Sequence, residues 1–201
     1  MPWILRSVAA SPFGRKVRIA GAVCGLDDRF TIEAADTLNP GDSLRSQNPL
    51  GKIPTLILED GSTLYDSRVI VEFLDAEAGG GVIIPKGAER FRVLTMQALA
   101  DGMLDASVLR ISEQRFRAPE MYNQRWLDHQ TGKVERGLAV FEASPPALSG
   151  TPHIGEIALA CLLGYLDFRF EGKWRASSPR LVAWLDEFAA GVPSFEATRP
   201  S

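Results

Sequence analysis

The stretch "SPFGRKVRIAGAVCG", residues 11–25, decides the fold of the first part of this chain. Ser11 is of a type preferred just before a helix, and Pro12 of a type preferred at the first helical position, where no backbone N–H is needed. Small and apolar residues then recur at helical spacing, at Phe13, Val17, Ala20, Gly21 and Cys24. This pattern predicts a helix that begins at Ser11-Pro12 and buries one face.

Short apolar segments stand on both sides of this helix. Residues 3–5 and 30–33 predict strands, which gives a β-α-β unit with a right-handed crossover. Residues 55–58 and 62–64 flank Asp60-Gly61, a turn pair that favours a hairpin. A second helix follows, capped by Asp66 or Ser67, and its predicted buried face consists of Val69, Ile70, Phe73 and Leu74. Residues 1–78 are therefore expected to form one β-α-β, β-β-α domain.

The rest of the chain shows only helical patterns. The segment "AGGGVIIPKG", residues 78–87, interrupts the first domain with glycines and a proline. Helical periodicity then covers residues 88–117, 120–143, 154–170 and 178–190, with breaks at prolines. We therefore expect an all-helical second domain over residues 88–201, so that the fold class is α/β plus all-α.

Composition limits the classes of partner. The chain has 201 residues, 45% of them hydrophobic, which is enough for a full core. Its net charge of −3 provides no field that attracts nucleic acid or anionic membranes, and no apolar run reaches the ~20 residues that span a bilayer. The two cysteines lie far apart and lack metal-ligand spacing, so we expect no metal, no disulfide framework and a cytoplasmic location.

Ser11 allows two interpretations at this point. It can act only as a helix cap, which is the commoner role of a serine followed by proline. It also stands in the turn between the first strand and the first helix, where backbone N–H groups and the positive helix end stabilise an anion. A thiolate would be stabilised at such a place.

Three stretches carry a family resemblance that extends over most of the chain. "SPFGRKVRIA", "NPLGKIPTL" and "LYDSRVIVEFL" resemble, in sequence and spacing, the signature stretches of the cytosolic glutathione S-transferases, of a bacterial serine type with zeta-, omega- or tau-like motifs. The resemblance implies a thioredoxin-like N-terminal domain followed by a helical domain. Glutaredoxin-like proteins carry Cys-Pro-Tyr-Cys at this place, but Ser11 and Gly14 occupy both cysteine positions here. Thiol-disulfide exchange therefore has no nucleophile at this site.

The resemblance assigns Ser11 as the catalytic residue. Its hydroxyl would donate a hydrogen bond to the sulfur of glutathione and favour the thiolate over the thiol. Lowering a thiol pKa from ~8.5 by about two units requires roughly 2.7 kcal/mol. A charge-assisted hydrogen bond of ~1.5 to 3 kcal/mol and a helix-end contribution of ~0.3 to 1 kcal/mol are sufficient in size.

The same resemblance assigns the glutathione-binding residues. It implies a cis peptide bond before Pro54, which turns the backbone of Ile53 towards the cysteinyl part of glutathione. Ser67 would hold the γ-glutamyl carboxylate, and Asp66, where many relatives have Glu, would meet its ammonium group. Lys52 is a candidate for the glycine carboxylate, with plain surface exposure as its alternative. Phe13 is a further binding candidate, although its spacing favours the core.

The helical domain is expected to supply the electrophile pocket between the domains. The candidates are Met103, Arg110, Gln114 and Arg117, of which the last three share one helix face, and a solvated face is the alternative. Asp101 and Asp105 are expected to lie at the surface or against a neighbouring subunit. His153 stands where the family has a hydroxyl residue before Glu156, so the usual capping box is not expected to form.

These observations predict a cytoplasmic, dimeric glutathione transferase of the detoxification type. Glutathione is its co-substrate, a small electrophile its second substrate, and neither nucleic acid nor membrane its partner. Two alternatives remain open. The first is a glutathione-dependent cis-trans isomerase of the maleylacetoacetate type, and the second is a non-catalytic binding protein with the same fold.

Overall fold

The computed structural model describes residues 2–148 and 150–200. Its N-terminal part contains a four-stranded sheet in the order β2-β1-β3-β4. β1 runs parallel to β2 and antiparallel to β3, and β4 is antiparallel to β3. The strands are β1 (Trp3–Arg6), β2 (Phe30–Glu33), β3 (Thr55–Ile57) and β4 (Thr63–Leu64). This mixed sheet agrees with the predicted thioredoxin-like N-terminal domain.

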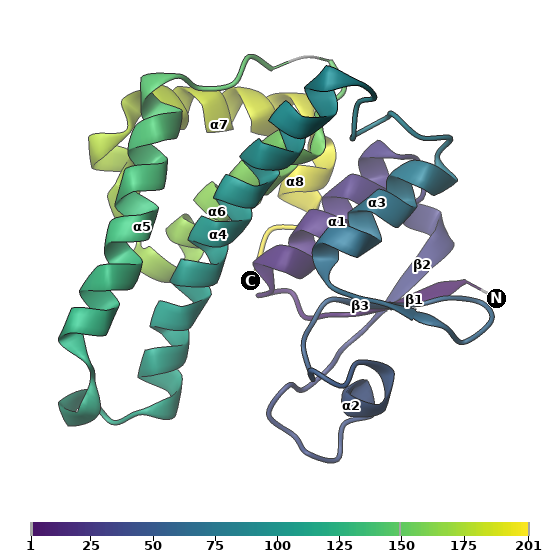
Figure 1. Ribbon diagram of the computed structural model, residues 1–201, viewed down its shortest axis with the longest axis horizontal. Helices are drawn as coiled ribbons and strands as arrows, with labels where there is room; N and C mark the ends of the chain where they lie inside the picture. The colour runs from purple at the N-terminus through teal and green to yellow at the C-terminus, as the bar shows by residue number, and fades with distance from the viewer. Residues whose placement is uncertain (1, 149, 201) are drawn as a thin grey trace.

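Two helices cover the face of the sheet that is turned towards the rest of the molecule (Figure 1). They are α1 (Pro12–Val23) and α3 (Ser67–Glu77), while the short α2 (Leu44–Gln47) lies apart from them in the loop between β2 and β3. α1 begins at the Ser11 cap and ends before Gly25, whose φ of 68° terminates the helix in the left-handed conformation. Residues Asp27–Arg29 add a single 3₁₀ turn.

The buried face of α3 differs from the prediction at two positions, because Val71 belongs to it and Val69 does not. Ile70, Val71 and Leu74 are fully buried, and Phe73 packs edge-on against Trp3 with a ring-centroid distance of 5.1 Å. Val69, predicted to be buried, is 47% exposed. Ile70, Val71 and Leu74 together occupy the arc of the helix that faces the core, and Val69 lies outside it.

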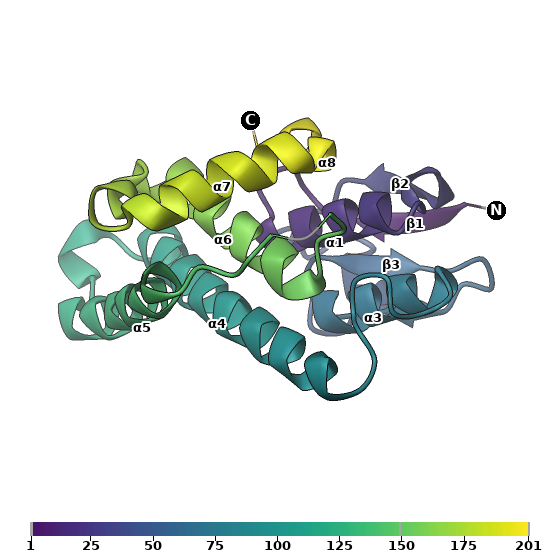
Figure 2. The ribbon, with the colours of Figure 1, turned by 90° about the horizontal axis from the view of Figure 1, so that it is seen from above.

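In the C-terminal part, helices are the only regular secondary structure among the described residues. α4 and α5 run antiparallel as a long pair, and α6 and α7 lie behind them (Figures 1 and 2). Two 3₁₀ turns, Pro119–Met121 and Lys173–Ser177, join helices. The α-helices are α4 (Ala88–Phe116), α5 (Gln124–Ala143), α6 (Ile154–Phe170), α7 (Pro179–Gly191) and α8 (Pro193–Ala197), and only α8 was not predicted.

Helix α6 forms the centre of the core, and its start corrects a prediction. Twelve of its 17 residues are buried, and it packs against both α4 and α1. The capping box does form: His153 Nδ1 accepts a hydrogen bond from the Glu156 N–H at 3.2 Å, and the Glu156 carboxylate accepts one from the His153 N–H at 2.7 Å. An unprotonated imidazole nitrogen can replace a hydroxyl oxygen as acceptor. Burial lowers the pKa of His153, which keeps that nitrogen available.

Residues 78–87 connect the two parts and are fixed by one buried carboxylate. Asp75 of α3 accepts hydrogen bonds from the N–H groups of Gly81 and Ile83, both at 2.8 Å, and of Ile84 at 3.2 Å. The carbonyl of Ile83 in turn accepts the Ile154 N–H at 2.8 Å. The connecting segment is thus bonded to α3 on one side and to α6 on the other.

Removing the Asp75 carboxylate is expected to destabilise the whole chain. Asp75→Ala leaves three backbone donors without their acceptor, two of them in buried residues. We expect a loss of about 2–3 kcal/mol in the free energy of unfolding, measured by urea denaturation. Glu77→Ala, on the exposed side of the same helix, is the control and is expected to change stability by less than about 0.5 kcal/mol. Equal effects of the two substitutions would contradict this role.

Among the described residues, no helix combines the length and the hydrophobicity needed to cross a membrane.

Candidate active site

Three chain segments meet at one end of the sheet because of the strand register. Arg6, at the end of β1, pairs with Thr55, at the start of β3. Leu64, at the end of β4, pairs with Leu56. The same end of the sheet therefore carries the turn after β1, the segment before β3 and the start of α3. These three segments hold Ser11, Pro54 and Ser67.

Ser11 caps α1 and still has a proton to donate. Its Oγ accepts a hydrogen bond from the Gly14 N–H at 3.1 Å, and the residue is 7% exposed. No described residue accepts a hydrogen bond from the Ser11 hydroxyl. Because a hydroxyl has two acceptor lone pairs and one donor proton, capping leaves the proton free for a ligand atom.

Position 14 cannot accommodate a side chain without rearrangement. A Cβ built on Gly14 would overlap the Oγ of the buried Ser7, and would also crowd the Cβ of Ser11 at 3.3 Å. Glycine at this place therefore lets the first turn of α1 pack tightly against the end of β1.

Neither of the chain's own thiols can serve as a nucleophile here. Burial raises the pKa of Cys24 and of Cys161 to about 11, so that both are neutral thiols at neutral pH. A thiolate at this site would have to come from a bound molecule.

The segment before β3 presents unpaired backbone groups. The peptide bond between Ile53 and Pro54 is cis, in agreement with the resemblance. The Ile53 N–H and C=O make no hydrogen bond to another described residue. Asn48 holds this segment in place, because its side-chain amide donates to the Lys52 carbonyl at 3.0 Å and to Thr55 Oγ1 at 3.1 Å. An extended ligand can pair with the free N–H and C=O as an added strand would.

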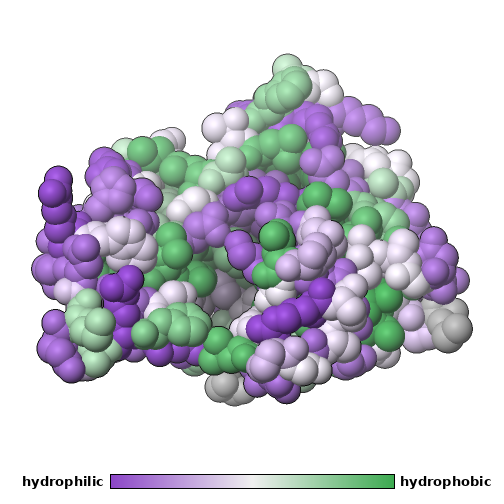
Figure 3. All heavy atoms as spheres, turned by 60° about the horizontal axis from the view of Figure 1, so that its bottom comes forward, coloured by the Kyte–Doolittle hydropathy of each residue, from purple (hydrophilic) through white to green (hydrophobic). Residues whose placement is uncertain are grey.

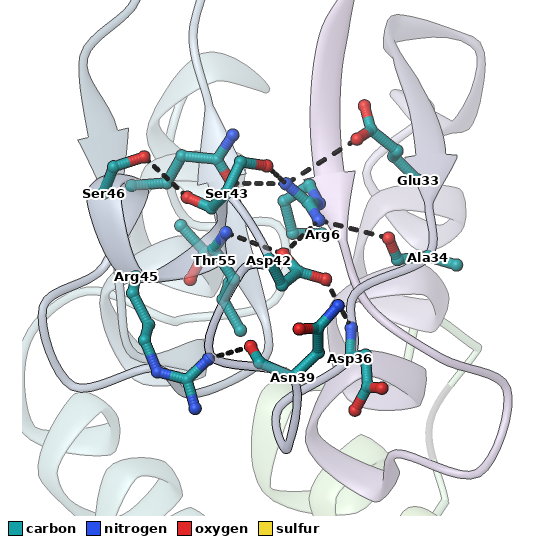
Figure 4. A network of polar contacts seen from close by, with 12 residues as sticks. Arg6, Glu33, Ala34, Asp36, Asn39, Asp42, Ser43, Arg45, Ser46 and Thr55 are labelled. Atoms are coloured by element: carbon teal, nitrogen blue, oxygen red, sulfur yellow. Dashed lines mark hydrogen bonds and ion pairs between the residues drawn. The ribbon is translucent and has the colours of Figure 1, made fainter.

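A buried arginine fixes the loop that leads into this segment (Figure 4). Arg6 of β1 is 2% exposed and donates to Ser43 Oγ at 2.7 Å, to Gln47 Oε1 at 2.6 Å and to the Ala34 carbonyl at 3.2 Å. It also pairs with Asp42 Oδ1 at 2.8 Å. These bonds tie α2 to β1. Sequence reasoning missed both Arg6 and Asn48, since each acts through partners that only the fold brings near.

The start of α3 combines a capping carboxylate with a buried hydroxyl. Asp66 is the N-cap, and its Oδ1 accepts from the Arg68 N–H at 2.9 Å. The peptide bond between Tyr65 and Asp66 is cis. Ser67 is the first helical residue and is buried, and its hydroxyl makes no hydrogen bond to another described residue. The Asp66 side chain is exposed.

A buried ion pair ties the two domains together directly behind this site. Lys16 Nζ of α1 lies 2.8 Å from both carboxylate oxygens of Asp101 of α4, and both side chains are fully buried. Arg68 Nε, at the start of α3, lies 3.1 Å from Asp101 Oδ2, and Arg68 Nη2 lies 3.8 Å from Asp105. The expectation that Asp101 is a surface or subunit-contact residue is therefore wrong. Burial raises the pKa of the half-exposed Asp105.

A spacing argument could have found Lys16. It follows Phe13 by three residues and precedes Ala20 by four, so it lies on the predicted buried face of the first helix. A lysine at such a position needs a buried acid as partner.

The remaining glutathione-binding candidates lie near these segments. Lys52 is exposed, directly before Ile53. Phe13 is half-buried and packs against the core, and the Lys16 ammonium lies 5.6 Å from its ring centroid.

The four candidate residues for the electrophile pocket, on α4 and at its C-terminal end, have different environments. Met103 is 2% exposed, and a Cβ built on Gly137 of α5 would overlap its sulfur, so its side chain fills the contact between the two helices. Arg110 stacks over the Phe170 ring at 4.2 Å. Arg117 pairs with Glu113 at 3.2 Å, and Gln114 is exposed.

The molecular surface at this end of the sheet is hollowed and of mixed polarity. Seen from below Figure 1, the surface is hollowed between the two domains, and hydrophobic and hydrophilic residues alternate around the hollow (Figure 3). Among the described residues, no group of His, Cys, Asp and Glu side chains is arranged as a metal site.

The fold and the site together define a two-domain protein in which a thioredoxin-like domain with a serine, in place of cysteine, at its first helix is joined to a helical bundle. Comparison with known families assigns residues 10–77 to the N-terminal domain and residues 124–187 to the C-terminal domain of glutathione S-transferases. A relative from Escherichia coli strain K12, the uncharacterized GST-like protein YibF, is 32% identical over 195 residues, which cover 94% of this chain and 95% of the relative. The chain belongs to the glutathione S-transferase family.

Solved structures agree with this assignment. A glutathione transferase family member from Pseudomonas fluorescens Pf-5 with bound glutathione is 44% identical, covers 99% of both chains and superposes with a TM-score of 0.91. A second structure of a family member from that strain holds S-(propanoic acid)-glutathione, with 44% identity, a TM-score of 0.87 and coverage of 99% of this chain and 100% of the other. A glutathione S-transferase from Methylobacillus flagellatus KT with glutathione bound is 34% identical, with a TM-score of 0.90 over 99% of this chain and 100% of the other.

Proposed function

We propose that this protein binds reduced glutathione at the end of its sheet and activates the thiol for attack on a small electrophile. The observation that carries the proposal is the Ser11 hydroxyl, which accepts a hydrogen bond from Gly14 and keeps its own proton free. Donated to the sulfur of glutathione, this proton stabilises the thiolate more than the thiol. Glutathione is known to bind to the similar proteins from P. fluorescens and M. flagellatus.

The tripeptide is proposed to lie along the three segments. Its cysteinyl backbone pairs with the free N–H and C=O of Ile53, beside Pro54, as a short added strand. Its γ-glutamyl carboxylate binds the Ser67 hydroxyl and the N–H groups at the positive end of α3. Its ammonium group meets Asp66, and Lys52 pairs with the glycine carboxylate.

The reaction needs little further help from the protein. The thiol proton leaves to solvent, and the sulfur then forms a bond to the electrophilic carbon while a leaving group departs or a double bond takes up a proton. Holding both reactants in one cleft contributes several kcal/mol through proximity.

The proposed electrophile carries a carboxylate. Arg110 and Gln114 share one face of α4, and Arg117 follows the end of the helix in an extended conformation. S-(propanoic acid)-glutathione, found in the similar P. fluorescens protein, bears a carboxylate on the carbon chain attached to its sulfur. Arginine binds carboxylates in a bidentate manner, which suits such a substrate. Met103 has too little exposed surface to touch a ligand and would act on this pocket only through the position of α4.

The proposal includes the domain boundaries, the oligomeric state and the cellular location of the protein. We place the glutathione-binding domain in residues 1–78 and the helical domain in residues 88–201, and we propose a homodimer in the cytoplasm, with a role in detoxification. Size-exclusion chromatography with light scattering tests the dimer.

The binding part is tested by calorimetric titration of reduced glutathione. Ser67→Ala is expected to weaken binding by roughly 10-fold or more, because one charge-assisted hydrogen bond to the γ-glutamyl carboxylate is lost. Ser62→Ala, in the β3–β4 hairpin away from the site, is the control and should bind like the wild type. Absence of glutathione binding by the wild type would overturn the proposal.

The chemical part is tested with a panel of electrophiles, including haloalkanoates and unsaturated acids. Conjugation consumes glutathione and yields a thioether, whereas isomerisation of maleylacetoacetate-type substrates returns glutathione unchanged. Binding without any turnover would identify a non-catalytic member of the family.

A further inference from the structure

A cavity outside the proposed glutathione site is lined mainly by residues of α6, α7 and α8. Helices α7 and α8 lie on the side of the molecule opposite α4 and α5 (Figure 2). The cavity has a volume of about 460 Å³, is open to solvent on one side, and is also lined by Arg15 of α1, by Arg175 of the last 3₁₀ turn and by Arg199 and Pro200 after α8. Apolar side chains from three of these helices line one part of it, namely Phe168, Leu185, Ala189 and Phe195. The proposed glutathione site makes no use of this cavity.

Two of the three arginines around the cavity have a carboxylate partner. Arg175 is bonded to Asp167 through two hydrogen bonds of 2.9 and 2.6 Å, and Arg199 lies 3.5 Å from Glu196. Arg15 is different. No carboxylate of residues 2–148 or 150–200 lies within 4 Å of its guanidinium, although the residue is only 4% exposed.

The fold prepares a place for this guanidinium. Its Nε donates to Thr198 Oγ1 at 3.2 Å, its Nη2 donates to the Phe195 carbonyl at 2.6 Å, and its plane lies 4.0 Å from the Phe195 ring centroid. Its Nη1 lies over Gly164 of α6, where any Cβ would overlap it. Arg15 is thus fixed at the cavity wall, and Nη1 makes no hydrogen bond to a described residue.

Among the described residues, Glu196 acts on the Arg15 charge only from beyond ion-pair distance. A buried guanidinium with no carboxylate in contact is costly, and an anion in the cavity would lower that cost. We propose that this cavity binds a small organic monocarboxylate, whose carboxylate pairs with Arg15 and whose apolar body packs against Phe168, Leu185 and Ala189. Asp186, an exposed residue at the cavity wall, opposes ligands of higher negative charge. The proposal does not depend on the glutathione-binding function.

The test is a titration of the full-length protein with benzoate, followed by saturation-transfer NMR, with uncharged benzyl alcohol as comparator. Benzoate should bind and benzyl alcohol should bind at least several-fold more weakly. Arg15→Met should weaken benzoate binding by roughly 10-fold or more, because a charge-assisted contact is lost. Asp186→Asn is the matched control at the same wall, and it should bind benzoate as tightly as the wild type or more tightly.

Two further measurements separate the cavity from other sites. Ala189→Leu adds three carbons to the apolar wall and leaves the hydrogen-bond partners of Arg15 in place, so it should weaken benzoate binding even if Arg15→Met fails to fold. Because Arg15 also borders a small hollow beside Ser11, the titration is repeated with reduced glutathione present, which should not displace benzoate. Benzoate binding that Ala189→Leu leaves unchanged, or displacement of benzoate by glutathione, would overturn the proposal, and so would absence of binding.

Discussion

Replacing Ser11 with alanine is expected to return the thiol pKa of bound glutathione towards the ~8.5 of a free thiol. It is also expected to lower kcat/KM at neutral pH by about 10- to 100-fold. The substitution removes the hydroxyl proton that is proposed to donate to the sulfur. The hydrogen bond from the Gly14 N–H uses a lone pair of the Ser11 oxygen and leaves that proton available. Thiolate absorbance of the glutathione complex, followed against pH, measures the first effect.

The direction in which the pH–activity profile should move follows from the protonation state of the bound thiol. With the hydroxyl present, the bound thiol is ionised at lower pH, so activity is retained further into the acid range. Without it, the pH at which activity rises should move upwards, and at high pH the rates of the two proteins should approach each other. A profile that changes only in height would argue against thiolate stabilisation by Ser11.

A matched control separates this effect from the capping role of Ser11. Asn123 caps α5 in the same way, since its side-chain oxygen accepts the Trp126 N–H at 3.1 Å. Asn123→Ala and Ser11→Ala should each cost about 1 kcal/mol of stability. Only Ser11→Ala should change the thiol pKa. If both variants lose the same stability and neither changes the pKa, then Ser11 is a helix cap and no more.

The second large effect is expected from the buried pair between the domains. Asp101→Leu removes the acid that lies 2.8 Å from Lys16 Nζ and leaves a fully buried ammonium without a partner. Breaking such a pair typically costs about 3–5 kcal/mol, so the variant should unfold at much lower urea concentration or fail to fold. The free energy of unfolding, from urea denaturation followed by circular dichroism, measures this cost.

Removing both charges distinguishes a costly orphaned charge from a stabilising pair. The double variant Lys16→Met with Asp101→Leu should recover most of the lost stability, because a buried pair replaced by apolar side chains of similar volume is often neutral. Asp105→Asn serves as the control, since Asp105 is exposed and lies 3.8 Å from Arg68. It should change stability by less than about 1 kcal/mol. A double variant as unstable as Asp101→Leu would show that packing at this place, and not charge, sets the stability.

The glutathione-binding ability of the double variant is a further readout. Asp101 holds the Arg68 guanidinium at the start of α3, next to Ser67. Glutathione affinity should therefore fall even where stability returns, because the binding end of α3 loses its connection to α4.

Several features of this protein were predictable because they depend on neighbours within a few residues. A cap such as Ser11 or Asp66 needs only an N–H two or three positions further along the chain, so the starts of α1 and α3 were predictable. Periodic burial gave the order of strands and helices in the same local way, and the motif around Pro54 indicated a cis bond that the structure contains. Even His153 bonds locally, and the prediction for it was wrong because histidine is generally a poorer helix cap than a hydroxyl residue, although its ring nitrogen does accept the Glu156 N–H here.

Other features depended on contacts between segments far apart in the chain. Lys16 and Asp101 are separated by 85 positions, and Arg6 and Gln47 by 41, so nothing in either local sequence identifies the partner. The same holds for Arg15, whose hydrogen bonds reach α8 and Thr198, about 180 residues away. The sequence by itself determined the class of fold, the starts of α1 and α3 and the segments that carry Ser11, Pro54 and Ser67. Only the tertiary structure decided which charges are buried, which of them are paired and where a cavity remains, because the cost of a buried charge depends on what the packed chain places around it.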